Sequence, residues 1–464
     1  MLKSHTCGEL RSQDAEKIVT LAGWVHRRRD HGNLIFIDLR DRWGIVQVVI
    51  NPEITPEAHK AAEAIRNEWV VHITGKVVLR QPGTENPRIE TGEIEIQADS
   101  VAILNPSNTP PFYINDEKSE EVDELLRLQY RYLDMRRPRM TQNIELRHKA
   151  IKFMRDYLDA EGFLEIETPI LLKSTPEGAR DYIVPSRLSP GSVYALPQSP
   201  QQLKQLLMVG GIEKYFQIAR CFRDEDARSD RQPEFTQLDL EMSFVTEDDV
   251  LNLTEELFTK LIKQITPHKQ IIEPFPRLTY KEAMLRFGSD KPDLRFEMEI
   301  QELSAIAKQS NIGILKSAVD DGGVVRGIKA AGCAKYSRRQ IDELVDLARS
   351  QGAQGLIAIN LIGEDEKISI NGIRSSIARA LTEEDLQAIA GHFDAKNGDL
   401  ILIVAGSESV VAPALGAIRQ EMGLQMNLPP EDLLALGFIT EMPLFDWNEE
   451  ENRWDSVHHP FTAP

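Results

Sequence analysis

Two arginines that flank a short polar loop are the residues best suited to chemistry. The sequence runs Phe222-Arg223-Asp224-Glu225 and then, after five residues, Arg231-Gln232-Pro233-Glu234-Phe235. Guanidinium groups match phosphate oxygens bidentately, so this pair of arginines suits a polyphosphate. The ring at the far end of the loop, Phe235, can stack on a purine. The plainer alternative is an acidic hairpin tip whose arginines hold no ligand.

Regular elements must hold this loop in place. The loop follows an alternating run at 215–221, which indicates a strand. Further upstream, Ile151, Met154 and Leu158 recur at helical spacing. They predict a helix over 143–160 that stops near Gly162.

Residues 1–104 predict a small all-β domain. Five strands with one intervening helix are typical of an OB-type barrel. The expected strands include 34–40, 45–50, 70–80 and 93–104, the helix covers 56–67, and turns fall at Trp43-Gly44 and Gln81-Pro82-Gly83.

Alternation assigns two faces to the strand at 34–40. Ile35, Ile37 and Leu39 point one way, into the core, whereas Phe36 points the other way. On the next strand, Gln47 is expected to share the outer face with Phe36. An outward ring beside polar and basic groups is a base-stacking platform in OB folds. The alternative is that Phe36 is an ordinary core residue.

Later segments differ in composition from this barrel. Residues 105–142 are Pro-rich and then strongly charged, which predicts a hinge. Residues 288–417 alternate helical and β-rich runs, such as 355–360 and 400–404, and predict a separate α/β insertion. After it, 436–445 predicts another buried strand.

The chain has 464 residues, enough for two to four domains. Its charge is unevenly distributed along the sequence. The net charge of −19 is unusual for a nucleic-acid binder, because phosphate contacts dominate such binding. However, 127–155 carries nine Lys or Arg against two acidic residues, and Arg27-Arg28-Arg29 forms a smaller basic cluster. These clusters are either solvated faces or docking strips for RNA.

Membrane insertion and secretion are not expected. The sequence has no run of about 18 apolar residues, and its first residues lack the apolar segment of a signal peptide. Cys7, Cys221 and Cys333 are isolated and odd in number, which argues against disulfides and zinc and favours a reducing cytoplasm.

Several segments together resemble one enzyme family. The arginine loop resembles motif 2 of class II aminoacyl-tRNA synthetases, which grips ATP, and 162–171 resembles motif 1, which builds their dimer interface. Segments 175–182, 198–204, 235–239 and 458–461 resemble bacterial-type aspartyl-tRNA synthetases. With this similarity from about residue 20 to the end, the chain is identified as a member of that family.

The resemblance implies an α+β multidomain fold. The barrel at 1–104 is then the OB-fold anticodon-binding domain, followed by the hinge at 105–142. The class II catalytic core, built on an antiparallel sheet, covers 143–287 and resumes at 418–464 after a GAD-like insertion at 288–417.

The family also implies roles for individual residues. A site for aspartate needs a cation for the side-chain carboxylate and acceptors for the ammonium. Lys204 suits the first need, and Arg223 is placed at the α-phosphate of ATP as a catalytic residue with Glu225. His458 in the His-His-Pro-Phe run is an aspartate contact, with packing or half of a metal site as alternatives. The implied aspartate contacts are Glu177, Gln201, Lys204, Arg223, Asp239 and His458, and the implied ATP contacts are Arg223, Asp224, Glu225, Gln232 and Phe235.

The implied reaction joins L-aspartate to tRNA through an adenylate, with ATP as substrate and Mg²⁺ as cofactor. The family's motif 3, its magnesium ligands and a second substrate arginine are expected after 458–461, yet the sequence stops at Pro464. We therefore expect a truncated homodimeric enzyme with no metal site in this span. The rival hypothesis is a non-catalytic tRNA-binding fragment.

The choice of tRNA is a separate question. Family members that charge both tRNA-Asp and tRNA-Asn resemble this sequence at His31 and Gly83, where stricter members tend towards Leu and Lys. Both residues can equally be plain loop and turn residues, and a strict tRNA-Asp enzyme is the alternative. The other implied anticodon contacts are Arg29, Phe36, Gln47 and Glu93.

Overall fold

The computed structural model describes residues 2–114, 122–175, 177–226, 232–364, 367–448 and 451–457. Its contacts divide the chain into two compact units, Met1–Lys152 and Phe153–Pro464. Across these described ranges, no helix is both long and apolar enough to cross a bilayer.

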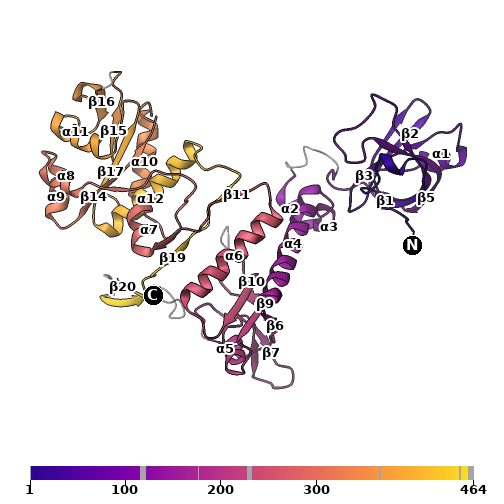
Figure 1. Cartoon of the computed structure of the whole chain (residues 1–464), viewed down its shortest axis with the longest axis horizontal. Helices are drawn as coiled ribbons and strands as arrows, with labels where there is room; N and C mark the ends of the chain where they lie inside the picture. The colour runs from indigo at the N-terminus through magenta and orange to yellow at the C-terminus, as the bar shows by residue number, and fades with distance from the viewer. Residues whose placement is uncertain are drawn as a thin grey trace. The chain divides into compact units, whose positions relative to one another are not determined.

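The first unit begins with a closed barrel (Figure 1). Its five strands follow the order β1-β2-β3-β5-β4. The predicted barrel is confirmed, and its helix α1 lies between β3 and β4. The predicted helix end at 67 is wrong, because Ile65 turns into the barrel core and is fully buried. The bounds are η1 Ser12–Asp14, β1 Ile18–His31, β2 Leu34–Arg40, β3 Ile45–Ile50, α1 Pro56–Glu63, β4 Val70–Leu79 and β5 Ile94–Asn105.

Alternation along β2 places the barrel core as predicted. Ile35, Ile37 and Leu39 are buried, whereas Phe36 is half-buried on the outer face. Full burial of one such aliphatic side chain contributes about 1.5–3 kcal/mol. A one-residue slip of β2 would expose this whole set, so the core fixes which residues face outward.

The segment predicted as a hinge carries helices. They are α2 Glu124–Gln129, α3 Arg131–Asp134 and the start of α4, Pro138–Ala160. The predicted helix start at 143 is wrong, because α4 begins five residues earlier, so the segment predicted as a hinge ends inside this helix. Pro138 explains the earlier start, since proline is preorganised for the first helical position and needs no donor there. A small cluster of Phe112, Ile114 and Leu133 packs this segment.

The second unit contains a small sheet in the order β10-β9-β6. β9, Lys214–Phe222, pairs antiparallel with β10, Glu234–Met242, and parallel with β6, Leu164–Glu165. Phe216 packs with Tyr157 and Leu158 of α4 and with Leu257 of α6, Glu247–Ile265. Figure 1 shows both helices beside this sheet. This apolar face leaves the other face of the β9–β10 pair for polar residues.

Short elements surround this sheet and lead into the insertion. Gly288 ends α7 in a left-handed conformation (φ 68°), and a Cβ there would lie 2.1 Å from the backbone oxygen of Ala412. Glycine is therefore required where the insertion begins. The bounds are β7 Ile183–Pro185, β8 Val193–Ala195, α5 Gln201–Val209, β11 Gln270–Ile271, β12 Arg277–Thr279 and α7 Tyr280–Phe287.

The insertion is a five-stranded sheet between two helical layers, which confirms the predicted α/β type. Its strand order is β13-β14-β17-β15-β16, with α10 and α12 packed on one face and α8, α9 and α11 on the other. The predicted end at 417 is wrong, because α12 continues and buries Met422. The bounds are β13 Gln301–Glu302, α8 Ser304–Gln309, α9 Gly313–Asp320, β14 Val324–Ala330, α10 Arg338–Ser350, β15 Ile357–Leu361, η3 Ile370–Gly372, β16 Ile373–Ser375, α11 Glu383–His392, β17 Leu400–Gly406 and α12 Glu408–Gln425.

After the insertion, two short strands pair with strands that precede it. β18, Leu433–Leu434, pairs with β11, and β19, Phe438–Thr440, pairs with β12. The single buried strand predicted at 436–445 is wrong, because Glu441 has a left-handed backbone (φ 54°) that ends β19. A separate hairpin follows, made of β20 Phe445–Asn448 and β21 Arg453–Ser456.

Candidate functional site

The floor of the candidate site is the polar face of β9 and β10. Side chains on one face of a strand recur at every second residue. Phe235, Gln237, Asp239 and Glu241 therefore share the face of β10 that lies opposite its apolar residues. Phe235 pairs in register with Cys221, at the end of β9 where the arginine loop begins. The face thus runs from the predicted ATP end to the predicted aspartate end.

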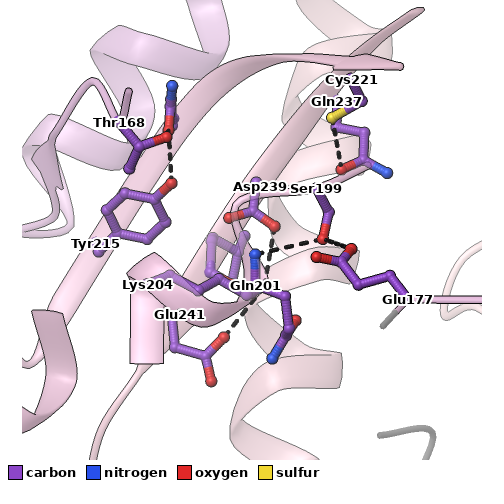
Figure 2. Close-up of polar contacts among 12 residues, drawn as sticks. Thr168, Glu177, Ser199, Gln201, Lys204, Tyr215, Cys221, Gln237, Asp239 and Glu241 are labelled. Atoms are coloured by element: carbon purple, nitrogen blue, oxygen red, sulfur yellow. Dashed lines mark hydrogen bonds and ion pairs between the residues drawn. The ribbon is translucent and has the colours of Figure 1, made fainter. Parts of the chain in front are cut away.

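Lys204 of α5 reaches this floor and forms two ion pairs there. Its Nζ lies 2.9 Å from Oδ1 of Asp239 and 3.1 Å from Oε2 of Glu241 (Figure 2). The side chains of Lys204 and Asp239 are 11% and 9% exposed. Sequence reasoning assigned these two residues to opposite ends of the substrate, whereas the structure places them in direct contact.

Burial and pairing act together on the protonation of this cluster. Burial lowers the pKa of Lys204, but its hydrogen bond to Asp239 and the attraction of Asp239 and Glu241 outweigh burial and raise it. Burial raises the pKa of Asp239 in spite of Lys204. Oδ2 of Asp239 is buried and has no hydrogen-bond partner among the described residues. The carboxylate therefore has acceptor capacity left for a ligand.

Glu177 approaches the same site from the segment that resembles the family at 175–182. Its carboxylate accepts hydrogen bonds from Thr175 Oγ1, at 2.9 Å, and from Ser199 Oγ. Ser199 Oγ also accepts from the backbone N–H of Gln201 at the start of α5 (Figure 2). Gln198 joins the two segments, because its side-chain amide makes two hydrogen bonds to the backbone of Ala179.

Arg223 lies at the other end of the floor. Its Cζ is 5.1 Å from the centre of the Phe235 ring, within cation–π range. Its backbone N–H donates to the carbonyl of Pro233 at 2.8 Å and so closes the base of the loop. Nε of Arg223 is buried and, within the described part of the chain, has no hydrogen-bond partner. A buried guanidinium nitrogen without a partner is costly, which indicates that a ligand completes this site.

The other predicted ATP and aspartate residues lie less centrally. Asp224 is fixed by its backbone, which exchanges hydrogen bonds with Arg180 at 3.0 and 3.2 Å. Glu225 and Gln232 are exposed on the two sides of the loop. Arg231 and His458 lie outside the described residues.

A second polar cluster lies on the outer face of the barrel beside Phe36. Arg29 on β1 donates to Asp38 of β2 at 2.6 Å and to Gln47 of β3 at 3.3 Å. The amide of Gln47 then donates to Glu95 of β5 at 2.9 Å. Arg29, Phe36 and Gln47 are thus brought together as predicted.

The remaining predicted anticodon residues are exposed. Glu93 precedes β5, so Glu95 occupies the position beside Gln47. His31 ends β1. Gly83 has φ 88°, and a Cβ there would meet nothing within 4 Å. Gly83 therefore serves its turn and leaves open space above it.

Sequence reasoning missed several residues of these two clusters. Glu241 could have been found, because it lies two residues after Asp239 on the same strand face. The same alternation selects Glu95. Arg80 has no such signal: it is 8% exposed, and its Nη2 lacks a hydrogen-bond partner among the described residues. Burial lowers the pKa of Arg80, although Glu95 and Asp38 oppose that effect.

Comparison with known proteins places the chain in a family. Residues 123–464 match the model of class II tRNA synthetases (D, K and N), and 19–104 match the model of the OB-fold nucleic acid binding domain. The aspartate–tRNA(Asp/Asn) ligase of Dehalococcoides mccartyi strain CBDB1 is 52% identical over 467 residues, which cover 100% of this chain and 78% of that protein. The ligase of the same name from Moorella thermoacetica is 54% identical and is covered over 75% of its length.

Solved structures show the same fold. Asparaginyl-tRNA synthetase from Pyrococcus horikoshii complexed with asparaginyl-adenylate aligns with 90% of this chain and 97% of its own, with a TM-score of 0.53 and 19% identity. At that identity the likeness shows shared architecture only. Taken with the matching family model and the relatives of about half-identical sequence, it leaves one assignment: the chain belongs to the class II aminoacyl-tRNA synthetases of the D, K and N group.

Proposed function

We propose that the protein is an aspartate–tRNA ligase that uses ATP to attach L-aspartate to both tRNA-Asp and tRNA-Asn. The two relatives named above carry this activity in their names and resemble the chain along its whole length. The observation that carries the proposal is the buried Lys204 beside Asp239, on the same sheet face as Arg223 and Phe235. It offers a cation and an anion for the two ends of an acidic amino acid, next to a phosphate-binding arginine.

In the first step, an oxygen of the aspartate α-carboxylate attacks the α-phosphorus of ATP. The new oxygen–phosphorus bond forms as the bond to the bridging oxygen breaks, and pyrophosphate leaves with that electron pair. Arg223 stabilises the charge that grows on the α-phosphate, and its unpartnered Nε supports this role. No protein nucleophile is needed, so catalysis is mostly positioning and charge stabilisation.

Side chains around this reaction hold the two substrates. Lys204 binds the side-chain carboxylate of aspartate, and Asp239, Glu177 and Gln201 accept from its ammonium group. Phe235 stacks on the adenine. On the proposed scheme Glu225 accepts from the adenine amino group, and Asp224, Gln232 and His458 complete the contacts to ATP and aspartate.

In the second step, a ribose hydroxyl of the terminal tRNA adenosine attacks the aspartyl carbonyl, and AMP leaves. The barrel selects the tRNA by its anticodon. Phe36 stacks on a base, while Arg29, Gln47 and Glu95 offer donors and acceptors beside it. We include Glu93 and His31 at the edge of this face.

Magnesium is expected to accompany ATP in this reaction. No group of three His, Cys, Asp or Glu residues that could hold a metal ion occurs within the ranges that the structure describes. Mg²⁺ that accompanies a nucleotide is usually held by one or two carboxylates together with the phosphates, so no magnesium ligands are named in this span and no step is assigned to the ion. Every charge stabilisation above is assigned to protein side chains.

We also propose that the protein is a cytoplasmic homodimer joined through the segment at 162–171. Cys7, Cys221 and Cys333 are free and buried, which suits a reducing compartment. Large apolar side chains of motif 1 and of the segment after it are exposed: Leu164, Ile170, Leu171, Ile183 and Leu188 are 45–79% exposed. A second copy would bury them, and sedimentation of the purified protein as a monomer at micromolar concentration would refute the dimer.

The activity is tested with purified tRNA-Asp and tRNA-Asn. We expect aspartate-dependent exchange of pyrophosphate into ATP and charging of both tRNAs with aspartate. His31→Leu is expected to reduce charging of tRNA-Asn more than of tRNA-Asp. Gly83→Lys is a poorer probe, because φ 88° strains any side chain there. Charging of tRNA-Asp alone by the unaltered protein would refute the dual specificity.

A further inference from the structure

A buried carboxylate joins three elements of the first unit. Glu68 precedes β4, its side chain is 4% exposed, and its backbone is left-handed (φ 64°). Arg40 of β2 donates from Nη2 to both carboxylate oxygens of Glu68 at 2.9 Å. The second partner is Arg136, in the turn between α3 and α4, which donates to Oε2 at 2.9 Å. We call Arg40, Glu68 and Arg136 the clasp.

The clasp ties the start of α4 to the barrel. Arg136 also lies over the ring of Trp24 on β1, with its Cζ 5.0 Å from the ring centre. α4 begins two residues after Arg136 and continues to Ala160, where Tyr157 and Leu158 pack in the second unit. Holding Arg136 thus orients the first turn of the helix that connects the two units.

The barrel end of the clasp adjoins the proposed anticodon face. Phe36, Asp38 and Arg40 alternate along β2 and lie on one side of it. Asp38 already pairs with Arg29 in the polar cluster beside Phe36. That cluster and the clasp are therefore neighbours on one strand, β2. The barrel end of the clasp therefore adjoins the face that a bound tRNA would engage, and its other end is the start of α4.

We propose that Glu68 is a positioning residue that couples anticodon recognition to aminoacylation by fixing α4 against the barrel. The proposal rests on the proposed function and extends it. A tRNA gripped at the barrel delivers its terminal adenosine accurately only if the connecting helix keeps one direction, and loss of alignment costs rate even far from the reacting atoms. Glu68 suits this role because Arg40 and Arg136 would repel each other without its charge.

The chain offers a matched control. Asp134 is also fully buried between two arginines, Arg131 at 2.6 Å and Arg137 at 3.0 Å, but all three residues lie within α3 and the turn after it. Asp134→Asn therefore removes the same chemistry without breaking a link to the barrel. Glu68→Gln breaks the clasp, and Arg136→Met breaks only its α4 side and leaves the Arg40 pair in place.

The first experiment measures geometry and needs no activity. Spin labels at Lys60→Cys on α1 and His148→Cys on α4 report the barrel-to-helix distance, and both positions are exposed while the native cysteines are buried. We expect a narrow distribution of label-to-label distances in the labelled parent and in Asp134→Asn. The distribution should be clearly broader in Glu68→Gln and Arg136→Met. An equally narrow distribution in the folded clasp variants would overturn the proposal.

The second experiment separates coupling from mere stability. We expect kcat/KM for tRNA to fall about tenfold in Glu68→Gln, within the usual range of coupling between sites. Pyrophosphate exchange without tRNA should change less than about twofold, and Asp134→Asn should match the parent in both assays. Broad distances with unchanged charging would refute the coupling. A parent without exchange or charging would refute the proposed function and the coupling with it, while the distances still decide whether Glu68 fixes α4.

Discussion

Removing the buried cation at Lys204 is the sharpest test of the aspartate site. Lys204→Met keeps the length of the side chain but leaves Asp239 facing Glu241 with no counter-charge. Breaking a buried ion pair from one side costs about 3–5 kcal/mol of unfolding free energy. We expect the lower end of that range, because the carboxylate of Glu241 is 31% exposed and keeps contact with water.

The double substitution Lys204→Met with Asp239→Asn separates the effect of Lys204 on protein stability from its effect on aspartate binding. Replacing both partners of a buried ion pair with neutral residues is often nearly neutral for stability. The double variant should therefore regain most of the lost unfolding free energy. It should not regain aspartate use, since no cation faces the substrate carboxylate.

Thermal unfolding and aspartate-dependent pyrophosphate exchange measure the two effects. Losing one charged hydrogen bond to aspartate costs about 1.5–3 kcal/mol, so kcat/KM for aspartate should fall about 10- to 150-fold in Lys204→Met. The fall should be at least as large in the double variant, which also lacks the Asp239 carboxylate for the ammonium group. KM for ATP should change less than about twofold in the double variant, because the ATP end of the floor is untouched. If the stabilised double variant uses aspartate normally, Lys204 is only the counter-ion of Asp239 and the recognition role is wrong.

Three further perturbations address the remaining contacts. Phe36→Ala should weaken tRNA binding by about 1–3 kcal/mol, whereas Phe244→Ala, whose ring is 92% exposed on the second unit, should leave the affinity unchanged; equal losses in a filter-binding assay would reject the stacking platform. Arg223→Ala should abolish pyrophosphate exchange while tRNA affinity is retained, and measurable exchange at a tenth of the parent rate or more would remove Arg223 from the α-phosphate. Burial and the nearby Arg40 lower the pKa of His26 to about 4, so the folded state resists its protonation. The contribution of His26 to the unfolding free energy is then largest above pH 6.5 and falls between pH 6.5 and 4, by about 2 kcal/mol at pH 5. His26→Asn should reduce this loss of stability between pH 6.5 and 4 in urea titrations. An unchanged loss in the variant would show that His26 does not cause it.

Local alternation is what made much of the fold predictable. Ile35, Ile37 and Leu39 are buried by the same period of two that the sequence displays, and β9 follows from the run at 215–221. Such patterns need no knowledge of distant residues. The motif-like segments likewise indicated Arg223 and Phe235, because their spacing lies within one loop.

Contacts between distant residues were not predictable in the same way. The pair of Lys204 and Asp239 joins a helix to a strand 35 residues later, and no local period encodes that distance. The hydrogen bond from Gln47 to Glu95 likewise joins two strands 48 residues apart, and the sequence does not display the register that brings them together. The early start of α4 was missed because Pro138 lies in a charged run that resembles a hinge, although proline favours a first helical turn.

The pairing of Lys204 with Asp239 makes aspartate recognition an exchange of partners. In the structure each charge already neutralises the other, so neither is left alone in a buried site. On the proposed function, aspartate gives its side-chain carboxylate to Lys204 and its ammonium to Asp239, and every buried charge again has a partner. The ammonium of asparagine can bind Asp239 in the same way, but its side-chain amide offers Lys204 no negative charge. Asparagine binding therefore separates the same Lys204–Asp239 ion pair and gains less binding free energy than aspartate does. Discrimination against asparagine then rests on the free energy needed to separate a buried ion pair. The shape of the site contributes little to it, because aspartate and asparagine have nearly the same shape.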